Sequence, residues 1–171
     1  MNILLALLLM TATVFTSTVD LKPGDKAPAF NAEATGGSHI SLHHYLGKSN
    51  VVLYFYPADM TSGCTVEACT FRDEIAKYKN TNTVVLGVST DSREMHQQFT
   101  AKDSLNFPLL VDTSRAICTA YGVPVADNGH AKRWTFLIGK DGKIAKVYHS
   151  VDVRVHSVEL LKDIAELNAK S

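Results

Sequence analysis

Cysteine is scarce in this sequence: Cys64, Cys69 and Cys118 are the only three among 171 residues. Three cysteines are too few for a disulfide scaffold, although a domain of this length buries a full core without one. An excess of charge is missing too, because 17 basic residues balance 17 acidic ones and no block of like charge stands out. The sequence therefore predicts neither nucleic acid nor an anionic membrane surface as a partner.

Long apolar runs are also absent, except for residues 3–15 near the N-terminus. This run of 13 positions is too short for a typical membrane-spanning helix and matches the core of a signal peptide. We expect residues 1–19 to be a signal peptide or an N-terminal anchor, and residues 20–171 to form one domain, exported to the periplasm or another extracytoplasmic space. A membrane anchor formed by residues 3–15 without cleavage, or a buried element, is the alternative.

Strands and helices alternate along the rest of the sequence. Continuous apolar runs rich in β-branched and aromatic residues are typical of buried strands. Strands are predicted at residues 51–56, 84–89, 109–111, 135–138 and 144–148. Helices are predicted at residues 64–79, 92–102, 114–121 and around a C-terminal stripe of Val158, Leu161, Ile164 and Leu167. This order predicts an α/β fold with a mixed central β-sheet flanked by helices, a pattern compatible with the thioredoxin-like fold.

Cys64 stands at the predicted start of a helix, shortly after a buried strand that ends at Pro57. The hydroxyl of Thr61 or Ser62 is expected to cap this helix by accepting a free N–H of the first turn. The unpaired N–H groups and the positive end of the helix dipole favour a thiolate at this position, and the thiolate is the nucleophilic form of cysteine. Cys64 is therefore a candidate nucleophile.

The helix dipole alone is a weak influence on Cys64, since it contributes only about 0.3–1 kcal/mol. A reactive thiolate needs a nearby cation as well, and the sequence offers Arg133, just before a predicted strand, and Arg72 on the helix itself. The hydroxyl of Thr61 could also donate a hydrogen bond to the sulfur. Without such partners, Cys64 would be only a small buried hydrophobic residue.

Cys69 follows Cys64 by five positions in the same predicted helix. In an intact helix the two residues would lie about 140° apart around the axis, with about 7.5 Å of rise between them. Their Cα atoms would be about 8.6 Å apart, beyond the limit of about 7 Å for a disulfide. A bond between them therefore requires the first turns to unwind, which suits a redox pair that reorganises. In the alternative interpretation, Cys69 only packs beside the apolar stripe.

The other candidate residues favour structural roles. Cys118 lies in a short predicted helix and is expected to pack in the core, with a role as another disulfide partner as the alternative. The seven histidines are scattered and the spacing of the cysteines differs from that of zinc sites, so no metal site is expected. Glu67 and Arg72 would form a surface pair or brace the helix, and the sequence leaves both interpretations open.

The segment YFYPADMTSGCTVEACTFRDE, residues 54–74, resembles the peroxiredoxins, and most closely their bacterioferritin-comigratory or Q-type subfamily. The family pattern joins Pro-x₃-Thr-x₂-Cys to a second cysteine five positions on and to a distant Arg-x-x-Phe strand. The residues that match it are Pro57, Thr61, Cys64, Cys69 and Arg133. The similarity extends from PGDKAPAF at 23–30 to DGKI at 141–144, and its parts are far apart in the sequence, which makes it specific.

The resemblance implies a thiol peroxidase for hydrogen peroxide and organic hydroperoxides, with no metal or organic cofactor. Cys64 would be the peroxidatic cysteine that becomes a sulfenic acid, and Cys69 the resolving cysteine that closes an intramolecular disulfide. Thr61 and Arg133 would bind and polarise the peroxide and hold the thiolate, while Pro57 would shield the sulfur. A thioredoxin-like or other dithiol donor would reduce the disulfide, and the protein would act as a monomer.

Two residues near the motif leave questions open. Ser62 stands where the subfamily usually has proline, which would make the turn looser or let the serine cap the helix itself. Trp134 beside Arg133 would shape a pocket wall or pack in the core. Besides the peroxidase, the sequence permits a thiol–disulfide oxidoreductase acting on protein substrates, although the cysteine spacing fits it poorly, or a non-catalytic binding domain on the same scaffold.

Overall fold

A mixed five-stranded sheet forms the centre of the protein, which is described here by a computed structural model of residues 19–170. The expectations for residues 1–18 lie outside this range. The strand order is β5-β4-β3-β6-β7. The strands are β3 (Asn50–Phe55), β4 (Thr83–Ser89), β5 (Leu109–Val111), β6 (Thr135–Ile138) and β7 (Ile144–Tyr148). Strands β3, β4 and β5 run parallel, and β6 and β7 are antiparallel additions, which confirms the predicted mixed sheet.

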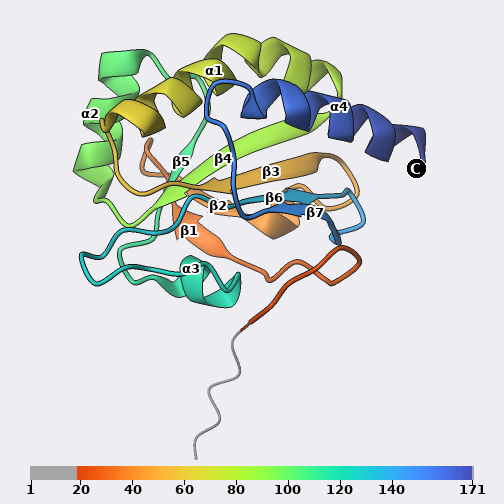
Figure 1. The fold of residues 1–171 in the computed structure, drawn as a ribbon, viewed down its shortest axis with the longest axis horizontal. Helices are drawn as coiled ribbons and strands as arrows, with labels where there is room; N and C mark the ends of the chain where they lie inside the picture. The colour runs from red at the N-terminus through yellow and green to blue at the C-terminus, as the bar shows by residue number, and fades with distance from the viewer. Residues whose placement is uncertain (1–18, 171) are drawn as a thin grey trace, which may run out of the picture.

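The helices cover both faces of this sheet (Figure 1). On one face lie α1 (Ser62–Asn80), α2 (Arg93–Asp103) and α4 (His156–Ala169). On the other face lie α3 (Ala116–Ala120) and the small antiparallel sheet of β1 (Asn31–Glu33) and β2 (His39–Ser41), which the short 3₁₀ helix η1 (Leu42–His44) follows. The strand that the sequence predicts at 51–56 is thus enclosed between two layers, which explains its continuous apolar run.

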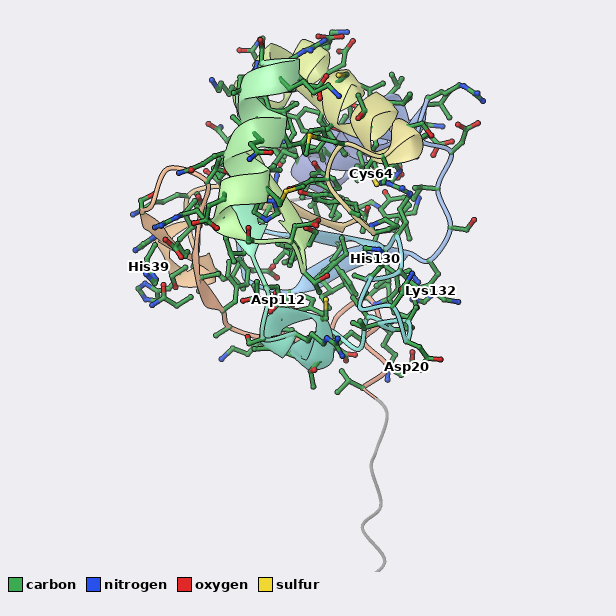
Figure 2. All side chains as sticks on the ribbon, turned by 90° about the vertical axis from the view of Figure 1, so that its left-hand side faces the viewer. Asp20, His39, Cys64, Asp112, His130 and Lys132 are labelled. Atoms are coloured by element: carbon green, nitrogen blue, oxygen red, sulfur yellow. The ribbon has the colours of Figure 1, made fainter. Side chains whose placement is uncertain are left out.

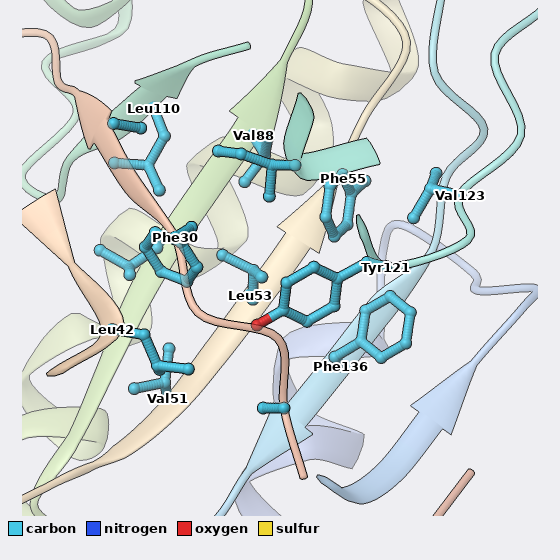
Figure 3. Close-up of a cluster of buried hydrophobic side chains, with 14 of the residues drawn as sticks. Phe30, Leu42, Val51, Leu53, Phe55, Val88, Leu110, Tyr121, Val123 and Phe136 are labelled. Atoms are coloured by element: carbon cyan, nitrogen blue, oxygen red, sulfur yellow. The ribbon is translucent and has the colours of Figure 1, made fainter. Parts of the chain in front are cut away.

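Strand β3 divides the core into two clusters because its successive side chains point to opposite faces. Val51, Leu53 and Phe55 belong to the first cluster, which Figure 3 shows together with Tyr121 and Phe136. The second cluster lies under α1 and α4 and takes the alternate residues of β3. All six residues of β3 are buried.

The amphipathic stripe of α1 is confirmed, but that of α4 is partly wrong. On α1, Cys64, Ala68, Phe71 and Tyr78 are buried and Ile75 packs at the edge. On α4, Ile164 is buried and Leu161 and Leu167 are partly buried, as predicted, but Val158 is 60% exposed. The fully buried apolar residues of the helix are Leu160, which the predicted stripe did not include, and Ile164. These two residues are four positions apart, so they follow the true period of 3.6, from which a strict spacing of three drifts away.

Between residues 19 and 170, no helix is long and apolar enough to cross a membrane. The longest of them, α1, carries polar residues over much of its outer face.

Gly87 in β4 marks a place where the second cluster is packed without spare room. It is the register partner of Tyr54 on β3. A Cβ atom at residue 87 would lie 2.9 Å from Cζ and Oη of Tyr54 and 2.7 Å from Cδ2 of Leu109. Only a residue without a side chain allows the tyrosine ring to lie over the strand here.

We therefore expect Gly87→Ala to lower the free energy of unfolding by about 1–3 kcal/mol, the usual cost of overpacking a core. Urea denaturation of the reduced protein measures this change. Gly36→Ala is the matched control, because nothing lies within 4 Å of a Cβ at residue 36. Equal stability of the two variants would contradict the packing described here.

Candidate active site

Three segments that are distant in the sequence meet at one end of the second cluster: the end of β3, the start of α1 and the segment before β6. The antiparallel pairing of β3 and β6 brings them together, with Tyr54 opposite Thr135. The N–H of Phe55 donates to the carbonyl of Trp134 at 2.7 Å. Arg133 therefore lies beside the loop of residues 57–61, from which α1 begins.

Cys64 occupies the first turn of α1 and is 2% exposed. The first helical hydrogen bond runs from the N–H of Thr65 to the carbonyl of Thr61, at 2.8 Å. The N–H groups of Ser62, Gly63 and Cys64 precede it and point out of the helix start. The position predicted from the sequence is confirmed, and in Figure 2 Cys64 lies at the beginning of α1.

The cation beside Cys64 is Arg133. Its Nη2 donates to the sulfur of Cys64 at 3.1 Å. A guanidinium at this distance favours the charged thiolate over the neutral thiol. Arg72, the other candidate, is engaged elsewhere, since its Nε donates to Asp73 at 2.8 Å and its Nη1 to the carbonyl of Asp103 at 2.6 Å.

Glu67 holds the other side of the Arg133 guanidinium. Nη1 of Arg133 contacts Oε2 of Glu67, and the two side chains form an ion pair whenever the carboxyl group is ionised. The side chain of Glu67 is completely buried, and Oε1 has no hydrogen-bond partner within residues 19–170. Burial raises the pKa of Glu67 from 4.5 to about 7, against the opposing influence of Arg133. Of the two interpretations of Glu67, the structure supports bracing of the active-site helix, and its partner is Arg133 rather than Arg72.

Thr61 precedes α1 as predicted, but its hydroxyl does not cap the helix. It donates to the carbonyl of Ala58 at 3.0 Å and accepts no N–H of the first turn. Thr61 is otherwise exposed. The hydroxyl of Thr61 therefore stabilises the loop in this structure, and no hydrogen bond joins it to the sulfur.

An open depression of about 520 Å³ lies next to the site. Pro57 and Arg133 both contribute to its lining, so the depression brings these two predicted residues together. His130 and Lys132 line it as well, from the loop before β6 (Figure 2). Trp134 packs against the first cluster and lies 4.0 Å from His149 between ring centroids. Trp134 is thus a residue at the edge of the core, in contact with His149, which lines the depression.

Cys69 lies farther along α1 and is partly buried. Burial raises the pKa of its thiol, and nearby Arg72 opposes this rise. Cys64 and Cys69 are both free thiols on one continuous helix, as the sequence predicts. A disulfide between them therefore requires a different conformation of the first turns of α1.

Cys118 packs in the core, on the far side of the sheet from Cys64. It belongs to the first cluster and Cys64 to the second. Burial and the neighbouring Asp112 raise the pKa of the Cys118 thiol. Over the residues that the structure describes, no three His, Cys, Asp or Glu side chains gather as metal ligands would.

A buried polar network under the 57–61 loop was not anticipated from the sequence. It joins Tyr56, Asp59 and His96, and all three are buried. The position of Asp59 inside the motif around Cys64 could have indicated a role for this residue. No local pattern indicated His96, which lies on α2 among mostly exposed residues. Glu67 was missed as an active-site residue for the same reason, because its partner is distant in the sequence.

Comparison with known proteins places these features in a family. A model of the AhpC/TSA family matches residues 23–147. The chain is 39% identical over 153 residues to Peroxiredoxin Bcp of Bacillus subtilis, covering 86% of this chain and 97% of that protein. It is 38% identical over 154 residues to Peroxiredoxin Bcp of Escherichia coli, covering 85% and 97%.

Solved structures give the same result. The crystal structure of Peroxidoxin BcpB from Mycobacterium tuberculosis superimposes with a TM-score of 0.82 at 32% identity, covering 86% of this chain and 99% of that chain. Xanthomonas campestris Peroxiredoxin Q superimposes with a TM-score of 0.77 at 30% identity, covering 81% and 91%. These similarities confirm the thioredoxin-like fold predicted from the sequence.

The raised pKa of Glu67 predicts a pH-dependent stability. The folded protein keeps the carboxyl proton up to about pH 7, whereas an ordinary glutamate loses it near 4.5. Because the folded state then binds more protons, the free energy of unfolding should fall as the pH rises from 5 to 7, by at most about 3 kcal/mol. Glu67→Gln should remove this part of the fall.

Urea denaturation at pH 5 and pH 7.5 measures the effect. Exposed Glu166 provides the control variant, Glu166→Gln, which should keep the wild-type dependence. An equal fall in wild-type protein and Glu67→Gln would show that the buried carboxyl does not hold its proton.

Proposed function

The chain belongs to the AhpC/TSA family and is a peroxiredoxin, a thiol peroxidase, and from this premise we propose that Cys64 is its peroxidatic cysteine and Cys69 its resolving cysteine. The observation that carries the proposal is the 3.1 Å contact between Nη2 of Arg133 and the sulfur of Cys64 at the start of α1. The sulfur of Cys64 thus lies next to two positively polarised groups, the N-terminus of α1 and the guanidinium of Arg133.

In the first step, the thiolate of Cys64 attacks the nearer oxygen of a hydroperoxide. The S–O bond forms as the O–O bond breaks, so the sulfur becomes a sulfenic acid and the second oxygen leaves as an alkoxide or hydroxide that takes a proton. Arg133 is placed to polarise the peroxide and to stabilise the developing negative charge. Glu67 keeps the guanidinium in position, and Pro57 and Thr61 border the approach to the sulfur.

In the second step, the thiol of Cys69 attacks the sulfenic sulfur and water leaves, which produces a disulfide. Both cysteines lie on α1, so the first turns of the helix must unwind before the sulfurs meet. The buried Cys64 becomes accessible in the same motion. The two thiols belong to one chain, so the cycle needs no second copy of the protein, and we propose that it acts as a monomer.

In the third step, an external dithiol of the thioredoxin type reduces the disulfide and is itself oxidised to a disulfide. The electrons for peroxide reduction therefore come from this donor, and the protein returns to the state described here. The substrates are hydrogen peroxide and organic hydroperoxides. No observation favours a thiol–disulfide oxidoreductase or a non-catalytic role over this function.

The roles of the cysteines are tested by single substitutions. Cys64→Ser should lower peroxide consumption in the presence of a dithiol donor to background, because the nucleophile is lost. Cys69→Ser should still form a sulfenic acid, which dimedone labelling detects, but no intramolecular disulfide. Cys118→Ser should behave as wild-type protein, since this thiol is completely buried on the other side of the sheet.

Mass spectrometry of peroxide-treated wild-type protein identifies the bond itself. A Cys64–Cys69 disulfide is the expected product. A bond between Cys64 and Cys118 in its place would exclude Cys69 as the resolving cysteine, and undiminished turnover by Cys64→Ser would exclude the whole mechanism.

We also propose that residues 1–19 direct the protein out of the cytoplasm. The support is the short apolar core of residues 3–15 and the fact that the family match begins only at residue 23. An exported enzyme would need a dithiol donor in the same compartment. Anchoring by residues 3–15 is the alternative arrangement.

Intact-mass measurement on protein purified from cells that express the full chain tests this proposal. Cleavage near residue 19 and recovery in an extracytoplasmic fraction are the expected results. Full-length protein in the membrane fraction would support the anchor, and full-length protein in the cytosol would contradict export.

A further inference from the structure

The carboxyl group of Asp59, in the loop that leads into α1, is held by two buried side chains. Its Oδ1 accepts the hydroxyl proton of Tyr56 at 2.7 Å, and its Oδ2 lies 2.7 Å from Nδ1 of His96. The other ring nitrogen of His96, Nε2, lies 3.1 Å from the carbonyl oxygen of Leu110 on β5. The exposed fraction is 6% for Asp59 and zero for His96, so water does not compete for these contacts.

The number of protons in this network follows from its partners. The carbonyl of Leu110 accepts only, so Nε2 of His96 must carry a proton. A neutral imidazole with a proton on Nε2 has a lone pair on Nδ1, which would face the oxygen of an ionised Asp59. Two acceptors at 2.7 Å in a buried site repel each other. One further proton therefore lies between Nδ1 of His96 and Oδ2 of Asp59, whichever atom holds it more closely.

The contact between Asp59 and His96 stabilises the 57–61 loop at a point where the backbone conformation is itself unfavourable. Met60, the next residue, has a φ angle of 58°, in the left-handed region that a non-glycine residue adopts at a cost of about 1 kcal/mol or more. The backbone N–H of Asp59 also donates to Oδ2 of Asp91 at 2.9 Å. Asp59 is thus the point at which the loop is joined to α2 and β5.

We propose that the proton shared by Asp59 and His96 holds the 57–61 loop and the first turn of α1 in the closed conformation, so that the two residues are positioning residues for Cys64. His96 acts from α2, which does not take part in the unwinding. When Asp59 leaves its pocket, the start of α1 loses its attachment and Cys64 is free to move toward Cys69. Only this last consequence rests on the proposed roles of the two cysteines.

The proposal implies a pH-dependent opening of the loop. The closed form keeps the shared proton that the geometry requires, whereas in the open form the two side chains are in water, where a carboxyl group is ionised and an imidazole releases its proton above about pH 6.5. The closed form then binds more protons, so its stability falls as the pH rises, by up to about tenfold in the opening equilibrium per pH unit.

The other ionisable groups around the pair do not supply such a proton. Tyr54 on β3 and Tyr56 just after it lie near Asp59, and burial raises the pKa of both hydroxyls well above the usual value, so they stay neutral. Asp91 faces the loop from the end of β4, where Ser89 donates to it at 2.7 Å. Glu67 lies in the segment that unwinds, and its pKa is about 7, so it also contributes to the pH dependence. The test therefore needs a variant that changes the Asp59–His96 pair and leaves Glu67 in place.

Asp59→Asn is this variant. The amide oxygen accepts the hydroxyl proton of Tyr56, and the amide nitrogen donates to Nδ1 of a neutral His96, whose Nε2 still donates to Leu110. Every hydrogen bond of the network is kept and no shared proton is needed. His96→Leu is the complementary change, because it removes the attachment altogether.

Hydrogen–deuterium exchange of the reduced protein tests the proposal without peroxide. Protection of residues 57–68, corrected for the intrinsic exchange rate at each pH, should fall steeply between pH 7 and 8.5 in wild-type protein. In Asp59→Asn it should change much less over the same range. In His96→Leu it should be low throughout, with no such slope. A peptide from α4 in the same digest should keep constant protection in all three proteins.

Equal slopes in wild-type protein and Asp59→Asn would overturn the proposal, as would wild-type protection that does not depend on pH. If Asp59→Asn does not fold by circular dichroism, His96→Leu decides the question, since a wild-type slope in that variant would also exclude the pair. Because the cysteines do not react in this experiment, it can succeed even if the assignment of Cys64 and Cys69 is wrong, and the assignment can hold even if it fails.

Discussion

The guanidinium of Arg133 joins a sulfur atom at a helix start to a carboxyl group buried below it, and the active site depends on this junction. One nitrogen contacts Cys64 at 3.1 Å and another pairs with Glu67. Arg133 reaches both because β6 pairs antiparallel with β3, which places the start of one strand at the end of the other. The antiparallel direction of β6 is therefore essential to the site, because a parallel strand in its place would begin at the opposite end of β3, far from Cys64.

Much of the architecture could be predicted from the sequence because it rests on local patterns. The strand at 109–111 and the hairpin of 135–138 and 144–148 occur where their apolar runs are, and the helix carrying Cys64 begins in the short segment that follows a buried strand and Pro57. The motif around Cys64 also pointed to Arg133. The resemblance to the peroxiredoxins added roles that spacing alone left undecided, and the comparisons confirm the family.

What the sequence did not indicate depends on contacts between distant segments. Glu67 is a charged residue on a helix and is ordinarily exposed, so only its pairing with Arg133 explains its complete burial. His96 is similar, because its partners are Asp59 in the loop and a carbonyl of β5. A hydroxyl at the start of a helix can form hydrogen bonds with several neighbouring groups, so the partner of Thr61, the carbonyl of Ala58, is known only from the folded loop.

The position of Cys118 has a consequence for the fate of the oxidised protein. The central sheet separates it from Cys64, with completely buried strands between the two clusters. Sulfenic acids react with whatever thiol they meet first, so a third cysteine on the same side would produce mixtures of crosslinked products. In the proposed cycle, the central sheet therefore keeps the third thiol, Cys118, apart from the sulfenic acid formed on Cys64.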